Sequence, residues 1–134
     1  MIQILDTSIV VKWFVDEDPE STQKALGILD HVKREPGLFA VPELLYSECL
    51  HVFGKVFDEA EEINWAMDRL FRLGIRPLRF DATVAKFAVP ALAWGLSGYD
   101  ATFFAFAKAV QGVWLTFDAK ASERVPEKKH VALL

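Results

Sequence analysis

The sequence predicts a single α/β domain with a central parallel sheet of about five strands, covered by helices on both faces. Three observations support this. Short apolar runs alternate with longer helix-like stretches along the chain. The length of 134 residues, with 52% hydrophobic and 25% charged residues, suits one globular unit, which we expect to span residues 1–134. No linker, repeat or low-complexity segment interrupts the pattern.

Turn-forming residues separate the expected elements. They occur at 18–19, 35–37, 74 and 95–98. Between these breaks, periodicity predicts the elements in chain order: strand 2–5, helix 8–15, helix 20–34, strand 38–41, helix 42–57, helix 59–73, strand 75–78, helix 82–94, helix 100–111, strand 113–117 and a last strand near 130–133.

The first and the fourth expected strands each end in an aspartate. The apolar run 2–5 leads into Asp6, and the run 113–117 leads into Asp118. Open α/β sheets place their sites just outside the carboxyl ends of the strands. We therefore expect both aspartates to lie at one edge of the sheet.

Two further acids are expected at the same edge. Asp100 opens the helix 100–111, and a helix between parallel strands runs antiparallel to them, so its first residue lies at the carboxyl edge. Glu48 lies within the helix 42–57, on the inward side by helical periodicity. The apolar stripe of that helix consists of Leu44, Leu45, Cys49, Val52, Phe53 and Val56.

Each acid also has a purely structural interpretation. Asp100 suits a helix N-cap, and Asp6 and Asp118 suit ordinary loops. Glu48 is harder to explain, because burying a carboxylate costs several kcal/mol unless it is paired or binds a metal; half-exposure beside Lys55 is the alternative. Four independent coincidences on one edge are less probable than one shared acidic site.

An acidic cluster of this kind predicts a divalent cation, Mg²⁺ or Mn²⁺. Hard cations take carboxylate and water oxygens and often use only one or two protein carboxylates. We expect Asp6 and Asp100 to be direct ligands, with Glu48 and Asp118 completing the site. The hydroxyls of Ser8 and Thr116 are candidates for orienting the carboxylates. The number of ions, one or two, is left open.

Zinc and thiol chemistry are not indicated. The chain has a single cysteine, so no internal disulfide can form, and no cysteine or histidine pair has zinc-ligand spacing. Cys49 lies on the apolar stripe and is expected to be a core residue rather than a nucleophile.

Four segments resemble the PIN domain family, particularly its VapC-like toxin ribonucleases. They are Ile4–Phe14, Val41–Leu50, Leu96–Ala101 with its tyrosine-aspartate-alanine run, and Leu115–Asp118 with its threonine-x-aspartate run. Their order and spacing match along almost the whole chain. One departure is His51, where many relatives carry an asparagine.

The resemblance implies a metal-dependent endoribonuclease that leaves a 5′ phosphate and a 3′ hydroxyl. It also implies the toxin of a toxin–antitoxin pair, a homodimer held inactive by a small antitoxin that inserts a segment beside the acids. Asp6, Glu48, Asp100 and Asp118 would be its catalytic acids. We expect a cytoplasmic protein, because no apolar run approaches a membrane span and the N-terminus lacks a signal peptide.

The overall charge does not attract RNA. With 15 basic and 19 acidic residues the net charge is −4, so any RNA groove must be local. Basic residues near the acids in sequence are candidates for phosphate contacts, although solvated helix faces explain them equally well. These candidates are Lys12, Lys108, Lys120 and Arg124.

Two other classes of α/β protein with an aspartate after the first strand do not fit this sequence. A haloacid-dehalogenase-type phosphatase requires a second aspartate two positions after the first, where this chain has Ser8, and a receiver domain requires paired acids after its first strand. A non-catalytic binding module with the same acids, and a house-keeping RNA-processing nuclease, remain as alternatives. The sequence does not name the target RNA or the antitoxin.

Overall fold

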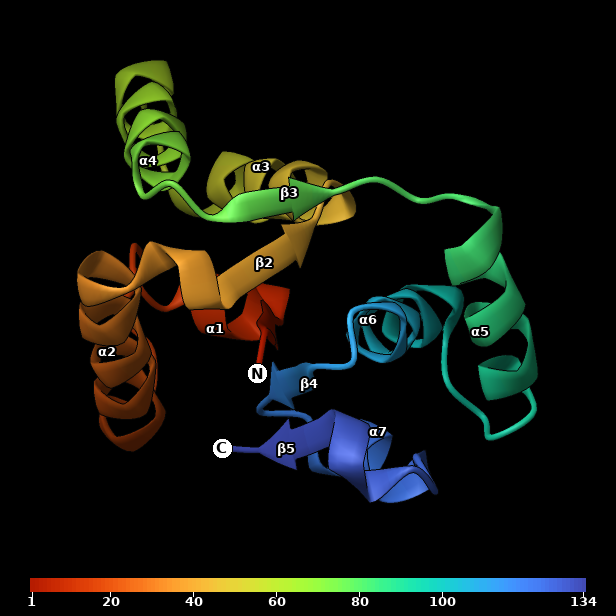
Figure 1. Ribbon diagram of the computed structural model, residues 1–134. Helices are drawn as coiled ribbons and strands as arrows, with labels where there is room; N and C mark the ends of the chain where they lie inside the picture. Colours follow the sequence, from red (N-terminus) through yellow and green to blue (C-terminus); the bar gives the residue numbers. More distant parts are fainter.

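A computed structural model describes residues 1–134 and confirms the α/β fold with one five-stranded sheet (Figure 1). All neighbouring strands pair in parallel, in the order β3-β2-β1-β4-β5. Ile4 in the central strand aligns with Ala40 on one side and with Trp114 on the other. The strands are β1 (Gln3–Leu5), β2 (Phe39–Pro42), β3 (Arg76–Leu78), β4 (Val113–Thr116) and β5 (Val131–Leu133).

Seven α-helices join these strands, and most begin and end within two residues of the predicted bounds. Two short 3-10 helices, Pro36–Leu38 and Lys128–His130, precede β2 and β5. The α-helices are α1 (Thr7–Val11), α2 (Pro19–Arg34), α3 (Leu44–Val56), α4 (Ala60–Arg72), α5 (Ala82–Leu92), α6 (Gly98–Ala109) and α7 (Ala119–Arg124).

The prediction of a helix over 8–15 was wrong in extent. α1 ends at Val11, because the next backbone N–H groups bond three residues back, from Trp13 to Val10 and from Phe14 to Val11. Such bonds tighten the last turn. The Trp13 indole then donates to Ala25 O at 2.8 Å, which ties this turn to α2.

The helix α7 was not predicted at all. It is only six residues long and follows directly on Asp118, whose carboxylate accepts a hydrogen bond from Ala121 N at 3.0 Å. Aspartate is a favoured N-cap residue, so the side chain that was assigned to the site also starts a helix.

Helices cover both faces of the sheet, as predicted. In Figure 1, α1 and α2 lie on one side of the strands, and α5 and α6 lie on the other. The strand order explains this, because connections from β1 to β2 and β3 run one way, while those from β3 to β4 and β5 run back. With right-handed crossovers the two sets occupy opposite faces. The reversal falls between β1 and β4, and ligand sites of open α/β sheets lie at such switch points.

The core lies between the sheet and its helices. Trp114 and Phe39 on the strands, with Phe53 and Phe104 on the helices, are its largest fully buried side chains. Cys49 is also fully buried, and burial raises the pKa of its thiol to about 12, which confirms a core residue rather than a nucleophile. None of the helices combines the length and the apolar character needed to cross a membrane.

Candidate functional site

The four acids meet at the carboxyl edge of the sheet. Asp6 directly follows β1, Asp118 lies two residues after β4, Asp100 is in the first turn of α6, and Glu48 is in the second turn of α3. Their charges interact: Asp6 and Asp100 both raise the pKa of Glu48, and Asp6 and Asp118 both raise the pKa of Asp100. The structure therefore brings together the four acids that the sequence grouped at one edge.

Asp6 is held by two donors from different elements. Its Oδ1 accepts from Ser8 N at 3.0 Å, which caps α1, and its Oδ2 accepts from the indole Nε1 of Trp114 on β4 at 3.0 Å. An ionised carboxylate has about four lone-pair sites, so two donors leave acceptor capacity on each oxygen. Asp6 is thus oriented without being saturated.

Glu48 reaches the acidic cluster from the helical face that the apolar stripe predicted. The side chain is half-buried, and its Oε1 accepts a 2.9 Å hydrogen bond from Thr7 Oγ1 at the start of α1. Burial is the main cause that raises its pKa, and the two neighbouring aspartates add to it. The other oxygen, Oε2, has no partner within the chain. Glu48 is placed to accept a proton at that atom.

Asp100 is not the N-cap of α6, contrary to its structural interpretation. Ser97 is the cap, because its Oγ accepts from Asp100 N at 3.0 Å. The Asp100 carboxylate is free of that role and faces the other acids, so burial and repulsion raise its pKa, while hydrogen bonding with the Ser97 side chain and the charge of Arg124 lower it in part. The helix starts two residues earlier than predicted for the same reason.

Asp118 is the most open of the four acids. It is exposed, and its carboxylate caps α7 while its own backbone N–H donates to Thr116 Oγ1 at 3.0 Å. Thr116 is fully buried. The predicted supporting threonine therefore orients Asp118 through the backbone rather than through the carboxylate.

The second predicted supporting residue, Ser8, acts differently. Its backbone N–H holds Asp6, whereas its Oγ is buried with no hydrogen-bond partner. A buried hydroxyl without a partner is costly and calls for a bound water or ion. Ser8 Oγ is thus an unpaired polar atom two residues along the chain from Asp6.

The donor set suits a hard cation that retains water. No group of three or more acidic, histidine or cysteine side chains converges closely enough to hold a metal ion by itself. Mg²⁺ usually keeps several waters and binds one or two carboxylates. Asp6 and Asp100, with the unpartnered Ser8 oxygen nearby, meet that requirement by chemistry, since every donor is oxygen.

Of the four basic candidates, Arg124 and Lys120 lie near the acids. Arg124 is close enough to Asp100 to lower its pKa, and its Nη1 donates to Gly95 O at 2.8 Å. Lys120 is exposed in the first turn of α7, two residues after Asp118.

The other two basic candidates form ion pairs with glutamates. Lys12 has a side chain only 10% exposed, donates to Ser8 O at 3.0 Å and pairs with Glu17 at 3.4 Å. Lys108 lies eight residues along α6 from Asp100, about 12 Å at the helical rise, and pairs with Glu127 at 2.9 Å. The sequence placed Lys108 near the last two acids, and this was wrong. Lys12 remains a predicted RNA contact, although most of its side chain is buried.

Three residues that build the site were missed. Thr7 contacts Glu48, 41 residues away, and Trp114 contacts Asp6, 108 residues away. No local sequence pattern predicts such pairs. Ser97 had a signal, because serine is a favoured N-cap and it lies three residues before an acid.

One family profile matches most of the chain. The profile of the family described as "PIN domain" matches residues 4–128. No curated protein sequence matches significantly.

Among solved structures, FitAB bound to an IR36 DNA fragment superimposes with a TM-score of 0.74 at 18% identity, over 99% of this chain and 94% of that one. FitAcB from Neisseria gonorrhoeae gives 0.73 at 16%, over 99% and 97%. VapBC2 from Rickettsia felis bound to a promoter DNA fragment gives 0.71 at 18%, over 100% and 99%. At these identities the likeness establishes the shared fold.

Proposed function

Because this chain belongs to the PIN domain family, we propose that it is a metal-dependent endoribonuclease and the toxin of a toxin–antitoxin pair. One observation carries the proposal: four carboxylates gather at the switch point between β1 and β4, and the pKa values of Glu48 and Asp100 are raised there. Repulsion among carboxylates lowers the stability of a fold, so its presence points to a function. Acids with perturbed pKa values cluster at functional sites.

The proposed roles follow from the position of each acid. Asp6 and Asp100 hold Mg²⁺ or Mn²⁺, with Asp6 oriented by Ser8 N and Trp114 Nε1. When bound, such an ion activates water and neutralises charge that develops on the phosphoryl oxygens. Glu48 takes a proton at its free Oε2 while Thr7 holds Oε1.

Asp118 and the basic residues beside it complete the proposed site. Asp118 flanks Asp100 on the exposed side, and Arg124 and Lys120 supply positive charge within reach of an RNA backbone. RNA as substrate, with 5′ phosphate and 3′ hydroxyl products, rests on the family resemblance. Cleavage of this kind in the cytoplasm would suit a toxin that acts on cellular RNA.

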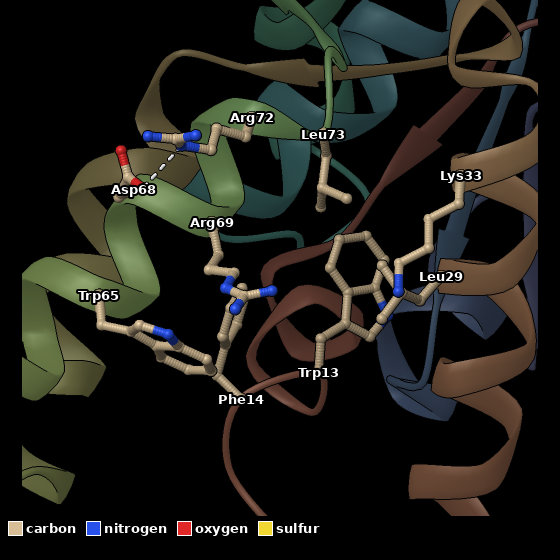
Figure 2. Close-up of a pocket in the computed structure, with 9 residues that line it drawn as sticks. All are labelled: Trp13, Phe14, Leu29, Lys33, Trp65, Asp68, Arg69, Arg72 and Leu73. Carbon is tan, nitrogen blue, oxygen red and sulfur yellow. Dashed lines mark hydrogen bonds and ion pairs between the residues drawn. The ribbon is translucent and has the colours of Figure 1, made fainter.

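A groove between α2 and α4 supports the proposed antitoxin partner (Figure 2). It has a volume of about 570 Å³. Its floor is aromatic, where Phe14 packs edge-on against Trp65 with ring centroids 6.2 Å apart. Arg69 and Lys33 extend into it from opposite walls in Figure 2. The lining residues are Trp13, Phe14, Leu29, Lys33, Trp65, Asp68, Arg69, Arg72 and Leu73.

The charge of this groove indicates the chemistry of its occupant. Asp68 is already paired with Arg72 at 2.8 Å, so Arg69 and Lys33 are the uncompensated charges. Arg69 lies over the Trp65 ring at 5.0 Å. We propose that a segment of the antitoxin fills the groove with apolar side chains and presents carboxylates to Arg69 and Lys33. One solved structure of the same fold is described as a toxin-antitoxin complex from Klebsiella pneumoniae, which supports a partner of this type.

The homodimer is proposed from the resemblance and from exposed apolar surface. Phe80, Val89 and Leu92 expose 58%, 66% and 48% of their area. Exposed apolar side chains of this size favour a partner surface. Light scattering on the purified chain at micromolar concentration tests this: a dimer mass is expected, and a strict monomer would contradict it.

Cleavage of a mixed pool of structured RNA tests the proposed activity. The parent chain is expected to cut with Mn²⁺ or Mg²⁺ and to stop with chelator, and Asp100→Asn is expected to lose cutting while Asp58→Asn, an exposed acid outside the site, retains it. Equal cutting by parent and Asp100→Asn would reveal a contaminant. No cutting by either, over many RNAs, would favour the non-catalytic binding module.

A further inference from the structure

A second cavity, of about 460 Å³, opens directly beside Glu48. It lies between α1, α3 and the first turn of α6. None of its lining residues belongs to the groove between α2 and α4. Its volume is within the range of small-molecule sites, about 300–1,000 Å³. The lining residues are Thr7, Leu44, Ser47, Glu48, His51, Val52 and Tyr99.

The chemistry of this lining excludes a phosphate. No lysine or arginine contributes to it, and Glu48 is its one acid, so an anionic group entering it would meet repulsion. The walls instead combine aliphatic and aromatic surface from Leu44, Val52 and Tyr99 with hydroxyl and imidazole groups. Such a site fits a flat, uncharged ligand with hydrogen-bonding edges.

Tyr99 provides the flat surface. It is 61% exposed, makes no hydrogen bond and stacks on no other ring of the chain, so its ring face is free. The adjacent N-cap, Ser97, fixes the helical turn that carries it. The same cavity is lined by Glu48, whose carboxylate interacts with Asp100, so the free ring lies in a cavity next to the acidic cluster.

His51 and Ser47 supply the polar groups on the opposite wall. Both are exposed on α3, where Ser47 is one residue before Glu48 and His51 is three residues after it. At that spacing His51 lies one turn further along the same helical face as Glu48. Its imidazole offers a donor and an acceptor, and Ser47 offers a hydroxyl, which together match the edge of a base.

We propose that an unpaired RNA base stacks on Tyr99 in this cavity and is read along its edge by His51 and Ser47. Sequence-specific RNA recognition generally uses splayed-out bases stacked on aromatic side chains. Glu48 lines the cavity and interacts with Asp100, so a base held in the cavity lies next to the acidic site. The proposal rests on the proposed ribonuclease function and adds a residue set for substrate choice.

The first test uses neutral ribonucleosides and needs neither turnover nor metal. NMR titration of the full chain with adenosine, guanosine, cytidine and uridine is expected to shift the side-chain signals of His51 and Tyr99, whereas ribose 5-phosphate leaves them in place. Tyr99→Phe is expected to keep the shifts at His51, and Tyr99→Ala to lose them. No shift with any nucleoside, or the same shift with ribose 5-phosphate, overturns the proposal.

The second test measures affinity for short single-stranded RNA by fluorescence anisotropy at several salt concentrations. Tyr99→Ala is expected to weaken binding roughly tenfold, the size of one lost base–aromatic stack, with an unchanged salt slope because no phosphate contact is lost. Phe71→Ala is the matched control, since Phe71 is 59% exposed but does not line the cavity. A tenfold loss in Phe71→Ala as well, or a changed salt slope in Tyr99→Ala, overturns the assignment.

These readouts separate the two proposals. A chain that binds nucleosides through Tyr99 but never cuts RNA would contradict the nuclease and support the base site. A chain that cuts RNA equally well with Tyr99→Ala, without nucleoside shifts, would support the nuclease and overturn the base site.

Discussion

The indole Nε1 of Trp114 donates a 3.0 Å hydrogen bond to Oδ2 of Asp6. The two residues are 108 positions apart and meet because β1 and β4 are neighbours, with Leu5 aligned to Leu115. Trp114 is fully buried and its ring stacks on Phe103 of α6. A core side chain therefore fixes the orientation of one proposed metal ligand. Through Trp114, the packing of the core against α6 influences the geometry of the site.

We predict that Trp114→Phe slows RNA cleavage by loosening the position of Asp6, without removing any of the four acids. The variant keeps an aromatic core but leaves Asp6 with one donor fewer, so kcat for RNA cleavage is expected to fall roughly tenfold, about 1.4 kcal/mol. Unfolding in urea should show a cost of about 1–3 kcal/mol from the lost hydrogen bond and the smaller ring. Trp94→Phe, a partly buried tryptophan without a bond to the acids, is the control. An unchanged kcat in Trp114→Phe would refute the positioning role.

The raised pKa values of Glu48 and Asp100 predict how stability depends on pH. In the metal-free chain the folded state binds more protons than the unfolded state, in the window that begins at the ordinary values of 3.8 for Asp and 4.5 for Glu and extends upward. The free energy of unfolding therefore falls as pH rises through that window.

Asp100→Asn removes one of these groups. We expect a shallower fall with pH and a gain of roughly 1 kcal/mol at neutral pH, as when a strained functional residue is relieved. Thermal unfolding with chelator, from weakly acidic to neutral pH, measures both effects. A variant with the same pH profile as the parent, or less stable at neutral pH, would contradict the repulsion among the acids.

Metal binding should appear as added stability. Mg²⁺ or Mn²⁺ at a hundred times its Kd is expected to stabilise the parent by about 2.7 kcal/mol, and chelator should reverse the rise in Tm. Asp6→Asn should abolish the rise. Its basal Tm is expected to be lower than that of the parent, because asparagine keeps the N-cap of α1 but has one acceptor oxygen instead of two and leaves Trp114 Nε1 without a partner. The same metal-induced rise in Asp6→Asn would remove Asp6 from the ligand set.

Arg124 and Lys108 should differ in their effect on RNA binding. Arg124 lies beside Asp100, whereas Lys108 is paired with Glu127 further along α6. We predict that Arg124→Gln weakens binding and lowers the salt slope by about one, and that Lys108→Gln changes neither. Arg124→Lys should restore most of the slope. Filter binding at several salt concentrations decides this, and equal slopes in all variants would remove Arg124 from the contacts.

The groove between α2 and α4 predicts where the antitoxin binds. Arg69→Glu reverses the charge that lies over Trp65, so affinity for the small protein encoded by an adjacent reading frame is expected to fall at least tenfold. Arg34→Glu, on the exposed side of α2 beside Asp30, is the matched control. Calorimetry measures both, and equal affinity of Arg69→Glu and the parent would place the antitoxin elsewhere.

The sequence by itself determined the order of strands and helices and the edge at which the acids gather. Both depend on local information: apolar periodicity defines each element, and Asp6 and Asp118 follow their strands directly in the chain. The inward position of Glu48 was also predictable, because helical periodicity places it beside a buried stripe. The end of α1 and the presence of α7 were not predicted, since both depend on turn bonds and caps of a few residues.

The tertiary structure alone decided which side chains support the acids. Trp114 reaches Asp6 because the strand order makes β1 and β4 neighbours, and Thr7 reaches Glu48 because α1 packs on α3. It also separated the basic residues, bringing Arg124 to Asp100 and leaving Lys108 with Glu127. Such contacts join residues far apart in the chain, so their geometry is set by packing and crossover direction rather than by any local pattern.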